Sequence, residues 1–335
     1  MLSEIIEDDV KKLASEFGGE LNRKKVLVTG GAGFIGSWLC DIVVTARGEV
    51  DCLDNFSTGK MENVKHLRDK IRLVSAEVEE AKLNGNYDYV FHFASRASPE
   101  EYQQHPVETM TANSTGTLRM LQVAKRSKSV FLYASSSEVY GDAQVVPTPE
   151  AYYGNVNPIG MRSCYDEGKR FGEALCMAFF RQDRVDVRIA RIFNSYGPRI
   201  REDGLYARAL PRFISQALRS EPLSIYGDGT QTRSFCYITD TVRGLLKMAV
   251  TGEISQKVFN IGSTREMTII ELAKLIIKKT RSKSTLKFLG AQPDDPKRRC
   301  PDITNASVWL TWKPSVLLEE GLERTIESFR TQFAS

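Results

Sequence analysis

The sequence is short of long apolar runs and of histidine, and each shortage excludes a class of protein. No apolar stretch approaches the roughly 20 residues that a membrane-spanning helix needs, so we expect no membrane partner. Residues 1–12 carry charges where a secretion signal would have its apolar core. The three histidines, His66, His92 and His105, have no metal-ligand spacing, and we therefore expect no metal site.

Cysteine is sparse and scattered: six cysteines lie far apart, and none forms a C-x-x-C pair. Such spacing is typical of reduced thiols in a cytoplasmic protein, because disulfide scaffolds and zinc sites need closer pairs. The formal net charge of +4 is too small an excess to indicate nucleic acid as a partner. With 335 residues, 41% of them hydrophobic, the chain suits one large α/β domain or two fused lobes.

Short β-rich runs alternate with helical segments up to residue 192, and this alternation predicts right-handed crossovers and a parallel sheet. After about residue 197 the loops lengthen and shorter strands mix with helices. An amphipathic pattern predicts a first helix over residues 3–17, and Thr268 with Glu271 forms a capping box for a helix over 269–279. The predicted strands are 26–28, 50–53, 71–74, 90–93, 130–134, 187–192, 223–226, 258–261 and 285–288. The other predicted helices are 37–46, 107–125, 165–181 and 319–329.

Three glycines, Gly30, Gly33 and Gly36, lie directly after the first predicted strand and before a helix. In a dinucleotide-binding turn, the first glycine permits the tight bend, the second lets the backbone approach a pyrophosphate, and the third lets helix and strand pack closely. Asp54 follows the next predicted strand, where an acid binds ribose hydroxyls and repels a 2′-phosphate. The pattern therefore predicts NAD, rather than NADP, as the cofactor. A structural glycine turn in an unrelated α/β protein is the alternative.

Tyr165 and Lys169 lie four residues apart on a predicted helix and therefore face the same way. A neighbouring ammonium lowers the pKa of a tyrosine hydroxyl, which would make Tyr165 a base for a hydroxyl proton. Ser136 and Glu138 follow the predicted strand 130–134, and polar side chains at the carboxyl end of a parallel strand lie where ligands bind. We expect these four residues to be catalytic, whereas a serine-rich loop with a solvated glutamate is the plain alternative.

Two longer stretches carry a family resemblance: residues 136–142, SSEVYGD, and residues 154–170, GNVNPIGMRSCYDEGKR. The chain resembles the extended short-chain dehydrogenase/reductase family of nucleotide-sugar enzymes from about residue 25 to the last predicted helix. Within that family it is most similar to the UDP-glucuronate decarboxylases, also called UDP-xylose synthases. Asp294, Asp295, Pro296 and Arg299 match the same pattern.

The resemblance implies that the chain converts UDP-glucuronate to UDP-xylose and carbon dioxide through a 4-keto intermediate, with NAD regenerated. Tyr165 would be the base, Lys169 its partner and Glu138 an acid/base acting around decarboxylation. Arg299 would contact the phosphate region of the substrate. The residues expected to bind substrate are Ser136, Glu138, Tyr165, Asn194, Tyr226, Gln231, Arg233 and Arg299. The residues expected to bind NAD are Gly30, Gly33, Phe34, Ile35, Gly36, Asp54, Asn55, Ser57, Thr58, Gly59, Glu77, Val78, Phe93, Ser95, Tyr165 and Lys169.

The chain departs from the family pattern near the expected site. Arg96 and Glu100 stand where prolines are usual, Thr111 stands where a lysine is common, and Met161 replaces a proline. The segment 205–212 is longer than in similar family members. These differences leave the class of enzyme unchanged, while the exact sugar and base stay open.

Three alternatives to a decarboxylase remain: a 4-epimerase, a 4,6-dehydratase and a non-catalytic nucleotide-sensing protein. A dehydratase needs an acid beside Glu138, where this chain has Ser137. An epimerase needs no carboxylate at Glu138. A sensor would be expected to have lost Tyr165 or Lys169, and both are present.

We expect an α/β fold with a Rossmann doubly wound parallel sheet and a smaller C-terminal α/β lobe. Residues 1–21 would form a helical extension, residues 22–200 the NAD-binding part, and residues 201–335 the nucleotide-sugar-binding lobe, with the chain crossing between the lobes. The site should lie in the cleft between them. The resemblance also implies a homodimer that forms through the helices 107–125 and 165–181.

Overall fold

The computed structural model describes residues 4–201, 208–291 and 295–334, and a seven-stranded parallel sheet forms its centre. The strand order is β11-β6-β5-β4-β1-β2-β3, which confirms the predicted doubly wound Rossmann sheet. The strands are β1 (Lys25–Thr29), β2 (Glu49–Asp54), β3 (Arg72–Ser75), β4 (Tyr89–His92), β5 (Val130–Ser136), β6 (Asp186–Ile192) and β11 (Val258–Ile261).

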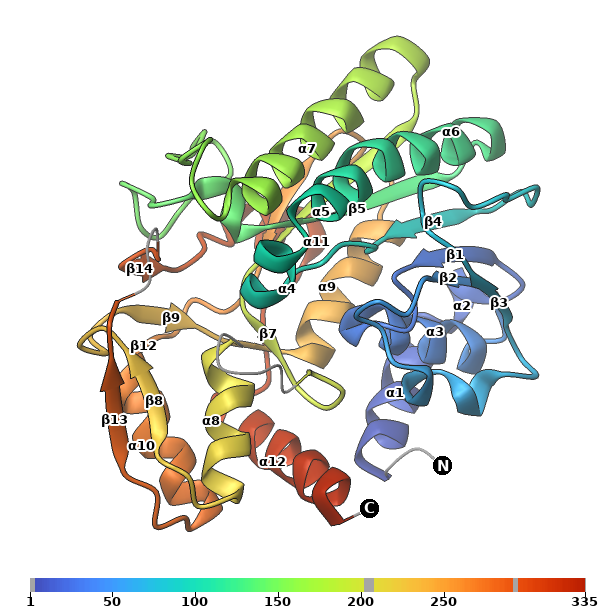
Figure 1. The fold of residues 1–335 in the computed structure, drawn as a ribbon. Coiled ribbons are helices and arrows are strands. Elements are labelled where there is room, and N and C mark those ends of the chain that lie inside the picture. The colour runs from blue at the N-terminus through green and yellow to red at the C-terminus, as the bar shows by residue number, and fades with distance from the viewer. Residues whose placement is uncertain (1–3, 202–207, 292–294, 335) are drawn as a thin grey trace.

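Alternate side chains of the strands bury against helices on the two faces of this sheet (Figure 1). Val26 and Val28 of β1 belong to the core beneath α1, α3 and α9, whereas Leu27 packs into the core under α6 and α7. On the first face lie α1 (Glu4–Glu16), α2 (Gly18–Leu21), α3 (Phe34–Thr45) and α9 (Ile238–Val250). On the second lie α6 (Thr117–Ser127) and α7 (Ser163–Asp183), with α4 (Pro99–Gln104) and α5 (Pro106–Thr111) leading into them.

The helix predicted over residues 107–125 is interrupted. Between α5 and α6 the residues Ala112–Gly116 form one π-helical turn, which inserts an extra residue without breaking the rod. Gly116 lies close to Val78 there, and a Cβ on it would stand 2.5 Å from the Val78 Cγ1 atom. Three short 3₁₀ turns complete this half of the chain: Met61–Asn63, Lys65–Leu67 and Ser137–Tyr140.

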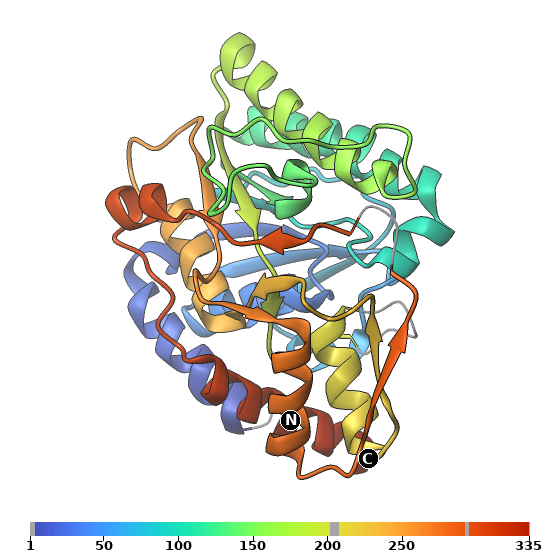
Figure 2. The ribbon, with the colours of Figure 1, turned by 90° about the vertical axis from the view of Figure 1, so that its left-hand side faces the viewer.

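A second group of elements lies below the carboxyl ends of the strands in Figure 1, and Figure 2 shows it from the side. Its helix α10 (Ile269–Thr280) starts with the predicted capping box of Thr268 and Glu271. The other helices are α8 (Ala209–Leu218) and α12 (Leu318–Ala334), whereas α11 (Thr304–Leu310) packs on α9 and on strand β11 of the central sheet. The strands pair as β8 (Leu223–Tyr226) with β13 (Leu286–Leu289), β7 (Ser195–Tyr196) with β10 (Cys236–Tyr237), and β9 (Thr232–Ser234) with both β12 (Glu266–Thr268) and β14 (Arg298–Arg299).

The chain crosses between the two groups, since α9 and β11 come after residue 200 and still belong to the central sheet and its cover. The division at residue 200 stays a prediction. The predicted N-terminal helix starts in the structure at Glu4, with residue 3 outside the described residues. It packs on α3, and Asp9 pairs with Arg324 of α12 at 2.7 Å. Within the described residues, no helix has the length and apolarity to cross a membrane.

Candidate active site

Two adjoining cavities open at the carboxyl ends of the central strands, where ligands of doubly wound sheets bind. The larger cavity has a volume of about 620 Å³ and surrounds the glycine turn. The smaller cavity has a volume of about 290 Å³ and lies between the sheet and the second group of elements. The residues that line both are Ile35, Phe93, Ser95, Ala97, Ile200 and Arg208.

The glycine turn between β1 and α3 packs so closely on neighbouring backbone that it leaves no room for side chains. Gly30 has a φ of +67°, and a Cβ on it would stand 2.9 Å from the backbone nitrogen of Ala94. A Cβ on Gly36 would collide with the carbonyl oxygen of Gly30. The start of α3 thus meets the cavity with bare backbone, an arrangement that favours an anionic diphosphate.

Acidic groups line the part of the larger cavity that lies next to the carboxyl end of β2. The carboxylate of Asp54 accepts hydrogen bonds from the backbone of Ala32 at 2.9 Å and of Phe56 at 2.8 Å, while burial raises the pKa of Asp54. Gly59 packs directly against this carboxylate. Glu77 lines the same part, where its carboxylate accepts a hydrogen bond from Asn55 at 2.7 Å. This negative lining suits ribose hydroxyls and opposes a 2′-phosphate.

The structure gathers most of the predicted NAD-binding residues around this cavity. Gly59 does not line it but flanks Asp54, and Tyr165 and Lys169 line the smaller cavity instead. Thr111, expected near the sugar, also lines the larger cavity. The predicted residues on its wall are Gly30, Gly33, Phe34, Ile35, Gly36, Asp54, Asn55, Ser57, Thr58, Glu77, Val78, Phe93 and Ser95.

Tyr165 and Lys169, both on α7, are buried where the two cavities meet. Tyr165 stacks on Tyr102 of α4, with ring centroids 5.2 Å apart. Burial raises the pKa of Tyr165 to about 12, although a hydrogen bond with Ser136 and the charge of Arg208 act in the lowering direction. Burial lowers the pKa of Lys169 to about 7. Its ammonium donates to the carbonyl of Ala134 at 2.9 Å and lies 5.7 Å from the centre of the Tyr165 ring.

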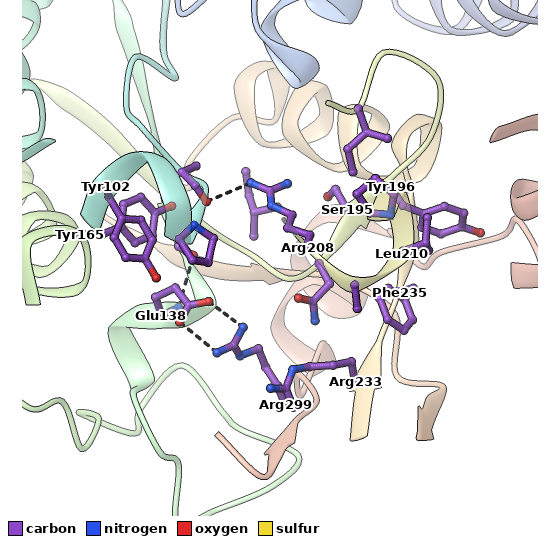
Figure 3. A pocket seen from close by; sticks show the side chains of 18 of the residues that line it. Tyr102, Glu138, Tyr165, Ser195, Tyr196, Arg208, Leu210, Arg233, Phe235 and Arg299 are labelled. Carbon is purple, nitrogen blue, oxygen red and sulfur yellow. Dashed lines mark hydrogen bonds and ion pairs between the residues drawn. The ribbon is translucent and has the colours of Figure 1, made fainter. Parts of the chain in front are cut away.

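Glu138 is held by two arginines from distant parts of the chain (Figure 3). Arg299 of β14 binds both carboxylate oxygens, at 2.6 and 2.9 Å, and Arg162 at the start of α7 forms a further ion pair. Burial by itself would raise the pKa of Glu138, but the charges of Arg299 and Arg162 outweigh burial and lower it to about 2. Glu138 is therefore a carboxylate at neutral pH. Arg299, which was expected to contact the substrate phosphates, lies beside this carboxylate.

The remaining predicted substrate residues also line the smaller cavity. Arg233 is paired with Asp295 at 2.7 Å and is only 7% exposed, so it is not a solvated surface arginine. Asn194 donates to the carbonyl of Ser234 at 3.0 Å. Gln231 donates to the carbonyl of Tyr226 at 2.8 Å, so these polar groups are fixed before any ligand binds.

Sequence reasoning missed four residues of the smaller cavity: Tyr102, Arg162, Arg208 and Asp295. Arg162 stands three positions before Tyr165, and that spacing on one helix face could have drawn attention to it. Arg208 lies within the segment 205–212, which is longer than in similar family members; residues 205–207 of that segment, and Asp294, lie outside the described residues.

The departure at Arg96 borders the larger cavity, whereas Glu100 lines neither cavity. Arg96 pairs with Glu101 at 3.0 Å, and the same carboxylate pairs with Arg201 at 3.2 Å. Arg96 is therefore a bound cation of the cavity wall rather than a solvated one. Met161 is 65% exposed and takes no part in either cavity.

Comparisons with known proteins agree with this geometry. The sequence profile of the NAD dependent epimerase/dehydratase family matches residues 26–262. UDP-glucuronic acid decarboxylase 1 of Danio rerio is 47% identical over 317 residues, which are 94% of this chain and 74% of that protein. UDP-glucuronic acid decarboxylase 5 of Arabidopsis thaliana is 45% identical over 309 residues, which are 91% of this chain and 89% of that protein. The structure of UDP-glucuronic acid 4-epimerase from Bacillus cereus with UDP-glucuronic acid and NAD has a TM-score of 0.83 and 31% identity, covering 92% of this chain and 99% of that one.

Proposed function

The chain belongs to the NAD dependent epimerase/dehydratase family, and from that premise we propose that it decarboxylates UDP-glucuronate to UDP-xylose. The observation that carries the proposal is the meeting of Tyr165, Glu138 and Arg299 in one cavity that adjoins a cofactor site. The decarboxylase relatives span nearly the whole chain and support the same reaction.

The larger cavity fits NAD, because its glycine turn would admit a diphosphate and its acidic end would admit ribose hydroxyls. Gly30, Gly33 and Gly36 would hold the diphosphate, and Asp54 the adenine-side ribose. When bound, NAD supplies the acceptor for a hydride from C4 of the sugar and returns that hydride later.

Tyr165 would take the proton of the 4-hydroxyl group, with the Ser136 hydroxyl holding the same oxygen. Its burial works against ionisation, so the base depends on nearby positive charge, and Lys169 and Arg208 both lie within reach of the cavity that Tyr165 lines. Lys169 supplies this charge only while it is protonated, because burial brings its pKa to about 7.

The 4-keto sugar that results is a β-keto acid. Its C5–carboxyl bond breaks, carbon dioxide leaves, and the electron pair moves to the C4 oxygen, next to Ser136 and Tyr165. A proton then adds at C5, the C4 ketone is reduced again, and Tyr165 returns its proton to the C4 oxygen. The sum is UDP-glucuronate and one proton in, UDP-xylose and carbon dioxide out.

Glu138 would act around the decarboxylation step as a carboxylate rather than as an acid. Two guanidinium groups hold its pKa at about 2, so it could donate a proton only after separating from Arg299. We propose that the carboxylate of the substrate approaches this same group of charges, since C5 neighbours the C4 hydroxyl that faces Tyr165.

Epimerisation of UDP-glucuronate at C4 is the second candidate, because a structurally similar protein crystallised with UDP-glucuronic acid and NAD is a 4-epimerase. Proton NMR of the purified protein with NAD and UDP-glucuronate separates the two. UDP-xylose with carbon dioxide is expected. Formation of UDP-galacturonate would instead indicate the epimerase. In a separate incubation with a UDP-hexose, a 4-keto-6-deoxy product would indicate a dehydratase.

We further propose a homodimer and a cytoplasmic location. Apolar side chains are exposed along the outer surface of α5, α6 and α7, which supports a second copy there: Val107 is 69% exposed, Met110 46%, Leu118 36% and Phe171 51%. Light scattering on Phe171→Glu would test the dimer. All six cysteines are free and buried, as is typical of a reducing compartment.

A further inference from the structure

Behind Glu138, Arg162 lies between two carboxyl groups. Besides its ion pair with Glu138, its Nε atom lies 3.9 Å from an oxygen of Asp166, one turn along α7. All three side chains are largely buried: 12% of Arg162, 13% of Glu138 and 8% of Asp166 is exposed. The guanidinium also lies 5.9 Å from the centre of the Tyr102 ring, so it has little freedom to move.

Asp166 differs from Glu138 in its hydrogen bonding. Within the described residues, its Oδ1 atom is buried and has no hydrogen-bond partner. Burial, joined by the negative charge of Glu138, raises the pKa of Asp166 to about 8 against the opposing charges of Arg162 and Arg299. At neutral pH Glu138 is therefore charged and Asp166 carries a proton.

Within this group the charges leave one positive charge in excess, while Arg208 and, when protonated, Lys169 add positive charge elsewhere on the wall of the same cavity. Arg162 and Arg299 supply two cations and Glu138 supplies one anion, while protonated Asp166 adds none. The charges of Arg233 and Asp295 cancel each other, because the two side chains form an ion pair. The other titratable groups around Asp166 are Glu167, which pairs with Arg170, and the neutral hydroxyls of Tyr102 and Tyr165.

We propose that Asp166 is a positioning residue that sets the preference for an acidic sugar by keeping one guanidinium charge free for the carboxylate at C5. Asp166 does not line the cavity, so it acts through Arg162. This inference rests on the proposed function, since UDP-glucuronate is the acidic sugar that function names.

The physical reason is the cost of buried charge. While Asp166 is neutral, the substrate carboxylate brings the group to zero net charge. Once Asp166 has ionised, the group is already neutral, and the same carboxylate would leave one uncompensated negative charge away from water, which is strongly unfavourable. Binding of an acidic sugar should therefore require the proton on Asp166.

Comparing UDP-glucuronate with UDP-glucose isolates this effect, because the two ligands differ only at C6. The measurement is the Kd of each ligand for the NAD-loaded protein by calorimetry, from pH 6.5 to pH 9.5. Above about pH 8, beyond the titration of Lys169 near pH 7, the affinity advantage of UDP-glucuronate is expected to fall by roughly tenfold per pH unit. Titration of the uracil ring affects both ligands and cancels.

Asp166→Asn keeps the shape of the side chain and removes its titration, so the advantage of UDP-glucuronate should stay level from about pH 8 to pH 9.5. Lys169 and Tyr165 also face the cavity, but they titrate equally in the variant. Glu167→Gln is the matched control on the next position of α7, where the side chain is 34% exposed and pairs with Arg170; it should keep the wild-type fall.

A wild-type advantage that is level above about pH 8 would overturn the inference, whether or not Asp166→Asn folds. So would an equal fall in wild type and in a folded Asp166→Asn. Because the readout is binding, it is separate from turnover. Loss of the advantage above pH 8 without any UDP-xylose would support the role of Asp166 and reject the decarboxylase.

Discussion

The two cavities are built by opposite means. The larger one is shaped by the absence of side chains, in a turn and an acidic strand end that span only residues 25–54 of the chain. The smaller one is shaped by charged side chains that come from far apart, such as Glu138 and Arg299, which are 161 positions apart. Added side-chain volume should therefore impair NAD binding in the larger cavity, whereas a changed charge should impair the reaction in the smaller cavity.

Removing one hydroxyl from the smaller cavity should have the largest effect on turnover. Tyr165→Phe is expected to lower the rate of UDP-xylose formation by about 10²–10⁴-fold, because the base is lost. The ring still stacks on Tyr102, so thermal unfolding and NAD affinity should not change. Tyr153→Phe, at a side chain that is 90% exposed, is the control. Turnover within a factor of three of the wild type would remove Tyr165 as the base.

Adding one methyl group to the larger cavity should disable it without any change of charge. Gly36→Ala forces a Cβ against the Gly30 carbonyl, at an expected cost of ~1–3 kcal/mol to the NAD-binding form of the turn, which corresponds to a loss of about 5- to 150-fold in NAD affinity. Gly252→Ala, where nothing lies within 4 Å of a new Cβ, should bind NAD normally. Fluorescence titration with NAD measures both, and equal affinities would contradict the role of the turn.

Changing a charge in the smaller cavity should spare the larger one. Glu138→Gln is expected to slow decarboxylation by about 10- to 100-fold, the worth of a charge-assisted hydrogen bond, with unchanged NAD affinity. The folded-state pKa of about 2 lies below the ordinary 4.5, so the stabilisation by Glu138 is complete above pH 4.5 and is lost as the pH falls toward 2.

Urea unfolding at pH 5 and pH 3 tests the second part of that expectation. The wild type should lose more unfolding free energy between the two pH values than Glu138→Gln does, because the variant has no carboxylate to protonate. An equal loss would mean that the two arginines do not stabilise the ionised form of Glu138.

The smallest effect is expected when one negative charge is removed from the larger cavity. Asp54→Asn should weaken NAD binding by about two- to tenfold, the worth of one hydrogen bond, and should narrow the preference for NAD over NADP. Titration with each cofactor gives the ratio. A preference as large as in the wild type would assign selectivity to the neighbouring acidic groups, Glu77 and Glu79, instead.

The same contrast explains what could be predicted from the sequence. The strand, glycine turn, helix and acid of the cofactor half are adjacent in the chain, so their spacing reports their geometry. No local pattern indicates which of the 46 basic residues reaches Glu138, because Arg299 arrives there through the pairing of β14 with β9. Arg162 lies within the motif of residues 154–170, but the motif does not show that its guanidinium reaches Glu138, because that contact depends on how the chain folds.

The helix predicted over residues 107–125 shows a second limit. The helical segment was predicted correctly, but a periodicity of 3.6 residues does not reveal the one extra residue that the π-helical turn at Ala112–Gly116 inserts. Likewise, Tyr165 and Lys169 were correctly predicted to share a helix face. The hydrogen bond of Lys169 to Ala134 depends on how α7 packs on β5, which the helix spacing does not contain.

The ring of charges around Glu138 also limits how this protein could acquire another substrate. A single replacement at Glu138 leaves two guanidinium charges together in the protein interior, whereas one at Arg162 or Arg299 removes the excess positive charge that an acidic sugar would meet, so an intermediate with one change would be less active. New specificity would have to arise through compensating pairs of substitutions in segments far apart in the chain. Directed evolution that randomises these positions together should therefore find routes that one-at-a-time mutagenesis does not.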